Sequence, residues 1–144
     1  MYFYKVKIES GEKSIDINDD TKNHFINEVN IIFDTISDDS REKSTAMIAR
    51  IDIKGNVERD INNQLKEIFD WSKDFKKSTT YRKVTIEVYD DEENILRTYS
   101  FGNMFVRDYK ECYNNNEKGD KGGTFELNLS QLERSFDSAE VFLG

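Results

Sequence analysis

The chain has 144 residues, the length of one ordinary domain, and 36% of them are hydrophobic, so residues 1–144 are expected to bury a single core. It carries 21 Lys and Arg against 29 Asp and Glu, and the formal net charge of -8 at pH 7 argues against direct nucleic-acid recognition through the phosphates. The sequence has no run of 18 apolar residues and no signal-peptide pattern at residues 1–7, so we expect no membrane insertion and a cytoplasmic location at synthesis.

The first half of the chain has mostly period-two hydrophobicity, which is typical of strands with one buried face. This alternation predicts strands over residues 2–9, 25–36 and 45–54. The polar residues 37–45 between the last two read as a loop, and so do residues 113–123 further on.

One segment changes to helical spacing. Apolar residues recur every three or four positions and predict an amphipathic helix over residues 60–75, with Asp60 as its N-cap. The stripe that we expect to be buried against the sheet consists of Ile61, Leu65, Ile68, Phe69, Ser72 and Phe75.

The second half returns to alternation. Residues 84–88 and the run from Ile95 to Tyr113 predict a hairpin around a polar turn at 90–94, and Gly102 and Asn103 predict a bulge or bend in its second arm. A last strand is expected over residues 125–129, after the glycines at 119, 122 and 123. The predicted fold is mainly β with one α-helix, a small antiparallel β-barrel or sandwich flanked by that helix.

Catalytic chemistry has few candidates in this sequence. His24 is interpreted as a solvated or structurally bonded histidine, and Cys112 as a small buried hydrophobe rather than a reactive thiol. One histidine and one cysteine also cannot form a Cys/His metal cluster within one chain. We therefore expect no enzyme activity, no catalytic residues, no cofactor and no metal.

Two acidic groups are weighed as cation sites. Asp16, Asn18 and Asp20 imitate the opening of a calcium loop, but Thr21 and Asn27 stand where that loop needs glycine and glutamate, so the spacing is interpreted as chance. The run of carboxylates at 90–93 is interpreted as a solvated hairpin turn.

Large apolar residues occur on both faces of several predicted strands. Tyr2 and Tyr4 share one face while Phe3 takes the other, and in a second such strand Tyr99, Phe101 and Phe105 oppose Met104 and Val106. A sheet that is apolar on both faces needs a second covering surface, which favours either a ligand-lined interior or contact with neighbouring subunits.

The order of these elements resembles the tube subunits of type VI secretion and contractile phage tails, in particular the haemolysin-coregulated protein (Hcp) family. The resemblance covers residues 25–133 and rests on three places: Ile51 to Ile53 leading to the helix around Leu65 and Ile68, the hairpin from Val84 to Tyr109, and the run from Thr124 to Leu129. Residues 10–24 lack the glycine-rich stretch of the family, which leaves open whether a first hairpin forms.

The resemblance implies a non-enzymatic structural subunit that forms hexameric rings and stacks them into a hollow tube. The partners that it implies are other copies of the chain, and beside them sheath, baseplate or effector proteins. It also implies that the protein is exported as part of a particle, without a signal peptide. In this family the connection at residues 37–45 reaches the next ring, so the expected stacking residues are Asp38, Asp39, Arg41, Glu42 and Lys43. The alternative is a small β-barrel binding module that holds an apolar ligand in its interior.

Overall fold

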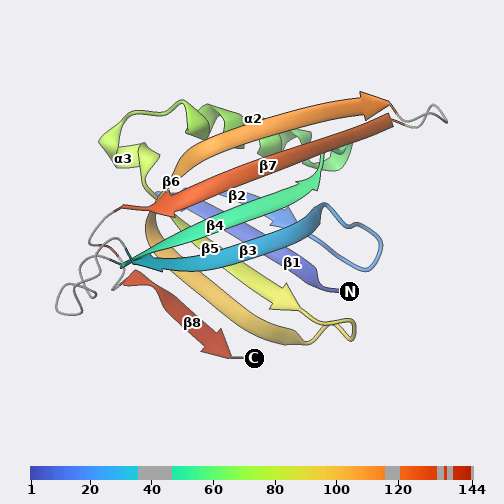
Figure 1. Cartoon of the computed structure of the whole chain (residues 1–144), viewed down its shortest axis with the longest axis horizontal. Coiled ribbons are helices and arrows are strands. Elements are labelled where there is room, and N and C mark those ends of the chain that lie inside the picture. Colours follow the sequence, from blue (N-terminus) through green and yellow to red (C-terminus); the bar gives the residue numbers. More distant parts are fainter. Residues whose placement is uncertain (36–46, 116–120, 133–134, 136–137, 144) are drawn as a thin grey trace.

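The computed structural model of the chain describes residues 1–35, 47–115, 121–132, 135 and 138–143. Strands dominate this part of the chain, and short helices lie at one side of them (Figure 1). The elements are β1 (Phe3–Ser10), β2 (Lys13–Asn18), β3 (Ile26–Thr35), β4 (Met47–Asn56), the 3-10 turn η1 (Arg59–Ile61), α2 (Asn62–Ser72), α3 (Lys77–Thr80), β5 (Arg82–Tyr89), β6 (Ile95–Asn115), β7 (Lys121–Gln131) and β8 (Glu140–Leu143).

The strands form one antiparallel sheet that does not close. Its order is β2-β1-β5-β6-β7-β4-β3, with β8 paired to β6 beside this path. The long strand β6 joins two halves, because it pairs with β5 as far as Met104 and with β7 from Met104 onward. The halves cross in Figure 1, and buried side chains from both form one core. The expected mainly antiparallel fold with a flanking helix is confirmed.

The bend in β6 lies at the predicted position. Asn103 has a φ of 56°, in the left-handed region, and the β5–β6 register shifts opposite this point. Beneath the bend, the side chain of Gln131 is buried: its Oε1 accepts the backbone N–H of Ala49, and its Nε2 lies 3.0 Å from the Gly102 carbonyl oxygen. One buried amide therefore connects β4, β6 and β7 where the two halves meet.

The helix packs onto the sheet with a narrower apolar stripe than predicted. Ile61, Leu65, Ile68 and Trp71 are buried, and α2 contacts β6 and β2. Phe69 lies beside this line and is 46% exposed. The prediction that it is buried is therefore wrong.

Both predicted ends of the helix also need correction. The regular helix ends at Ser72, so Phe75 leaves the helical period and is 91% exposed. Asp60 is not the N-cap: it lies inside η1, and Ile61 occupies the N-cap position of α2 without a side-chain capping bond. The 3-10 turn, in place of a polar cap, leads the chain into the helix.

Two strands were not predicted. β2 pairs with β1 around a turn at Gly11, whose φ is 62°, and so forms the first hairpin that the sequence left open. β8 lies along the first part of β6, where Phe142 is the partner of Thr98.

Gly55 in β4 gives a first testable prediction. A Cβ at this position would lie 2.6 Å from two ring carbons of Phe125 and would also meet the backbone oxygen of Phe25. Because the same oxygen accepts the N–H of Asn56 at 2.8 Å, the backbone cannot move aside freely. Gly55→Ala should lower the free energy of unfolding by about 1 to 3 kcal/mol, measured by urea denaturation.

Gly122→Ala is the matched control for this substitution. Among the described residues, its added Cβ would have the carbonyl oxygen of Asn114 alone within contact range, at 3.5 Å. Equal losses of stability in the two variants would contradict the argument from close packing.

Candidate assembly surfaces

The predicted stacking connection lies outside the described residues. Asp38, Asp39, Arg41, Glu42 and Lys43 all fall within 36–46, so their structure is not described. The strands on either side are described, and Thr35 at the end of β3 is the cross-strand partner of Met47 at the start of β4. The connection thus begins and ends at one place, at the same end of the molecule as α3 (Figure 1).

The edge strand β3 is the longest open edge of the described sheet. Within the described part of the chain it pairs with β4 alone, along ten residues. Ile32 and Phe33 on it are 40% and 43% exposed, and the Phe33 ring lies 6.1 Å from that of Phe101. A long edge that exposes apolar side chains is a surface on which another chain can pair.

A second apolar surface lies on β8. Val141, Phe142 and Leu143 are 47%, 54% and 77% exposed, although they alternate between the two faces of the strand. Burial in the core of one chain therefore does not account for this strand. The exposed apolar area thus lies on β3 and β8, whereas the sequence predicted it for the strands of Tyr2 to Tyr4 and of Tyr99 to Val106, where Phe101 and Met104 are buried in the core.

The interior is filled by large side chains. Trp71, Phe101 and Phe125 are among those that are completely buried. The Nε1 of Trp71 donates a hydrogen bond to the carbonyl oxygen of Thr80 at 2.8 Å. The Arg82 guanidinium lies 5.0 Å from the centroid of the Trp71 ring.

A groove of about 680 Å³ lies between the β1–β2 hairpin and the helices α2 and α3. Most of its lining is charged, including Lys13, Glu67, Asp70, Lys73 and Arg82. This groove does not suit an apolar ligand.

The neighbours of His24 and Cys112 that the structure describes are structural ones. The imidazole of His24 stacks on Phe3, with ring centroids 4.9 Å apart and an angle of 20° between the planes, which agrees with a structural role. Cys112 is exposed, and its Sγ accepts a hydrogen bond from Asn114. The prediction that this cysteine is buried is wrong, because this end of β6 extends beyond the core.

The acidic groups have structural partners. In the hairpin turn, Asp90 Oδ1 accepts the N–H groups of Glu92 and Asn94, both at 2.9 Å. Asp20 likewise accepts the N–H groups of Lys22 and Asn23. Among the described residues, no group of three or more His, Cys, Asp and Glu side chains is arranged to hold a metal ion.

Asp19 is the one carboxylate of this region that is almost fully buried, with 2% of its surface exposed. Its Oδ1 accepts the N–H groups of Phe25 and Ile26, at 2.8 and 3.2 Å, and its Oδ2 accepts that of Tyr4 at 3.3 Å. Burial raises the pKa of this carboxyl above its ordinary value, while the three N–H groups and nearby His24 oppose the rise. Asp19 therefore fastens the start of β1 to the start of β3.

Three tyrosine hydroxyls donate hydrogen bonds to carboxylates on the hairpin strands. Glu111 accepts the hydroxyls of Tyr109 and Tyr113, at 2.6 and 2.7 Å, and the pKa of each phenol is raised, mainly by burial at Tyr109 and by the hydrogen bond at Tyr113. The hydrogen bond from the Tyr89 hydroxyl to Glu87 raises the pKa of Tyr89 to about 12. These phenols stay protonated at neutral pH and hold the carboxylates in place.

Comparison with solved structures identifies the fold. The chain matches Hcp1 from Salmonella typhimurium with a TM-score of 0.53 and 12% identity, over 87% of this chain and 81% of that one. It matches Hcp1 from Flavobacterium johnsoniae with a TM-score of 0.52 and 16% identity, over 97% and 99% of the two chains. A chain of the PVC sheath–tube complex, an extracellular contractile injection system in its extended state, matches with a TM-score of 0.57 and 17% identity, over 98% and 88%.

This chain has the fold of Hcp and tube proteins. The resemblance drawn from the sequence is confirmed at the level of the fold, and it extends beyond residues 25–133 to nearly the whole chain. No protein-family model matches the sequence, and no curated protein matches it. Among the described residues, no helix is long and apolar enough to cross a membrane.

Proposed function

We propose that this protein is a non-enzymatic structural subunit of a phage-tail-like or secretion tube, which assembles into rings that stack into a hollow tube. The observation that carries the proposal is the fold match along the full length of both chains, since 97% of this protein and 99% of the Flavobacterium Hcp1 superpose. The open edge of β3 and the exposed apolar residues of β8 support it, because a subunit needs such surfaces to meet its neighbours.

The partners that we propose are other copies of the chain first, and then proteins of the sheath, baseplate and cargo. Matched structures include a sheath–tube complex and the tube-terminating cap of the anti-feeding prophage, the latter with a TM-score of 0.55. The protein would then act in, and leave the cell with, an assembled particle. Electron microscopy of the purified chain at high concentration tests this directly, because the proposal requires rings and tubes.

The connection at 36–46 is the proposed stacking contact. Its acidic residues Asp38, Asp39 and Glu42 alternate with the cations Arg41 and Lys43, so it can pair with charges of a neighbour and fix the order of stacking. Replacing residues 37–45 by a tight turn should spare folding and ring formation but abolish tubes, as seen by electron microscopy. Circular dichroism is the folding control, and tubes of parental length from the shortened protein would contradict this role.

His24 and Cys112 provide a further prediction. His24→Ala and Cys112→Ala should leave assembly intact, because the contacts of His24 with Phe3 and of Cys112 with Asn114 are structural. Sedimentation of the assembled material measures the effect. Loss of assembly in a variant that still folds would show that the residue has a functional role.

A further inference from the structure

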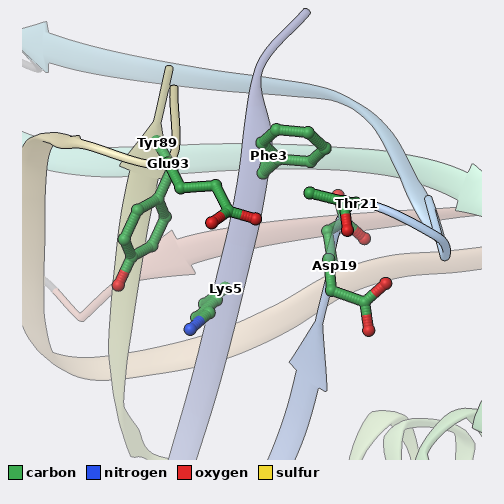
Figure 2. Close-up of a pocket in the computed structure, with 7 residues that line it drawn as sticks. Phe3, Lys5, Asp19, Thr21, Tyr89 and Glu93 are labelled. Atoms are coloured by element: carbon green, nitrogen blue, oxygen red, sulfur yellow. The ribbon is translucent and has the colours of Figure 1, made fainter. Parts of the chain in front are cut away.

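A cavity of about 260 Å³ opens at the end of the molecule where β1 begins and the β5–β6 hairpin turns (Figure 2). Three segments far apart in the sequence meet around it. Its lining includes Phe3, Lys5, Asp19, Asp20, Tyr89 and Glu93.

The walls of this cavity suit a cation with an apolar stem. The ammonium of Lys5 already lies 4.9 Å from the centroid of the Tyr89 ring, so one wall attracts positive charge. In Figure 2 the Glu93 carboxylate lies between the rings of Tyr89 and Phe3. Within the described part of the chain, no hydrogen bond or ion pair of the Glu93 side chain is found. A lysine or arginine side chain would place its stem on the rings and its charge on this carboxylate.

Two exposed apolar side chains lie beside the cavity, among the carboxylates of the hairpin turn. Met1 and Tyr2 are 77% and 56% exposed, and the amino group of Met1 pairs with Asp91 in the hairpin turn. A matching partner therefore presents an exposed apolar side chain next to its cation.

The opposite side of the same molecule carries an exposed apolar side chain next to cations, as such a partner requires. Phe75, with 91% of its surface exposed, is followed by the exposed residues Lys76 and Lys77 at the start of α3. Figure 1 places α3 and the start of β1 at opposite ends of the long axis. In the described part of the chain, no carboxylate lies within ion-pair distance of either lysine ammonium.

We propose that the segment 75–77 of one copy docks at this cavity of the next copy, with Phe75 on the Met1 and Tyr2 rim and a lysine ammonium against Glu93. The contact joins two different surfaces, and because these lie on opposite sides of the molecule (Figure 1), repeating it extends an open stack of rings. This inference rests on the proposed function, since it names a contact between successive rings.

The test is complementation between two charge-reversed proteins. Glu93→Lys blocks the cavity of one protein, and the double change Lys76→Glu, Lys77→Glu reverses the docking segment of the other. Each protein alone should form tubes at least about fivefold shorter than the parent, because like charges then meet at every contact. In a 1:1 mixture, rings of the two proteins can alternate with opposite charges at every contact, so tubes should return to within about twofold of parental length.

Glu58→Lys is the matched control, because Glu58 is exposed, makes no side-chain capping bond, and lines neither the cavity nor the Met1 and Tyr2 rim. It should leave tube length within about twofold of the parent. The inference is overturned if the two charge-reversed proteins each form normal tubes, if their mixture forms none, or if Glu58→Lys acts as strongly as Glu93→Lys.

A second measurement separates this inference from the proposed function. The acetylated and amidated peptide of residues 74–78 is added to the parent at low salt, and the amide resonances of Phe3 and Tyr89 are followed by NMR. Saturable shifts that Glu93→Lys abolishes support the docking contact even for a parent that forms no tubes, whereas unchanged resonances contradict it. A parent that stays monomeric and still shows the saturable peptide shifts contradicts the proposed function alone.

Discussion

Replacing Leu65 with alanine should lower the free energy of unfolding by about 2 to 5 kcal/mol, the usual cost of removing a large buried aliphatic side chain. Leu65 is 3% exposed and lies in the buried line of α2 with Ile68 and Trp71. These residues pack against the sheet, so a cavity at this position would loosen the helix from the rest of the core. Urea denaturation followed by circular dichroism measures the loss.

Phe69→Ala is the control for Leu65→Ala. Phe69 lies on the same helix but is 46% exposed, with the ammonium of Lys73 5.0 Å from its ring centroid. Its loss should cost clearly less, although the side chain is larger. An unchanged unfolding midpoint for Leu65→Ala would show that the helix is peripheral to the fold, and a larger loss for Phe69→Ala would contradict the assignment of Leu65 to its buried face.

Replacing Asp19 with alanine should cost about 3 kcal/mol or more, because the buried N–H groups of Phe25 and Ile26 then lose their acceptor and each unpaired group costs about 1 to 3 kcal/mol. Asp19→Asn separates the hydrogen bonds from the charge. Asparagine keeps an oxygen for Phe25 and Ile26, loses only the longer bond from Tyr4, and buries no charge. It should therefore retain most of the stability.

The pH dependence of the parent follows from the same group. The folded pKa of Asp19 is raised, so the folded state binds the proton more tightly than the unfolded state. The stability that comes from this difference in proton binding is present below the unfolded pKa of Asp19 and is lost as the pH rises through its folded pKa, while the hydrogen bonds to its carboxyl oxygens remain. Urea denaturation at several pH values between the unfolded and folded pKa of Asp19 should show that the free energy of unfolding falls less with rising pH in Asp19→Asn than in the parent. Equal destabilisation by asparagine and alanine would contradict the role of the hydrogen bonds.

Alternation predicted most of the strands because one face of each is buried. In β4, Ala49, Ile51 and Ile53 are buried and the residues between them are not, so the buried face can be read directly from the sequence. The same holds for Val84 and Ile86 in β5. Where burial of one face decides the structure, prediction from the sequence succeeded.

The two missed strands do not have that signal. The buried residues of β2 are only Ile15 and Ile17, which are too few to show a period of two. The stronger indication of a hairpin was Gly11, in the short turn between Ser10 and Lys13. β8 has no buried residue, and its pairing with β6 defines it. Backbone pairing between distant segments leaves little trace in a local pattern.

Prediction from the sequence also failed at the ends of the helix and for residues whose burial depends on distant segments. Phe75 continues the spacing of the apolar stripe, but the helix ends at Ser72, and the residue that completes the buried line is Trp71. Asp16, Asp19 and Asp20 look alike in sequence, yet Asp19 alone is buried, because Tyr4 and Phe25 bring backbone N–H groups to it. Similarly, the cavity near Glu93 is built from three segments and has no single motif.

Self-association is the central claim, and the mass of the full chain in solution measures it most directly. In light scattering over a range of protein concentrations, the measured mass should first reach a plateau at a whole-number multiple of the 16.9 kDa chain mass, and six is the multiple that a hexameric ring gives. The mass should then rise further at higher concentration, as rings stack. A mass of 16.9 kDa at every concentration would contradict the claim.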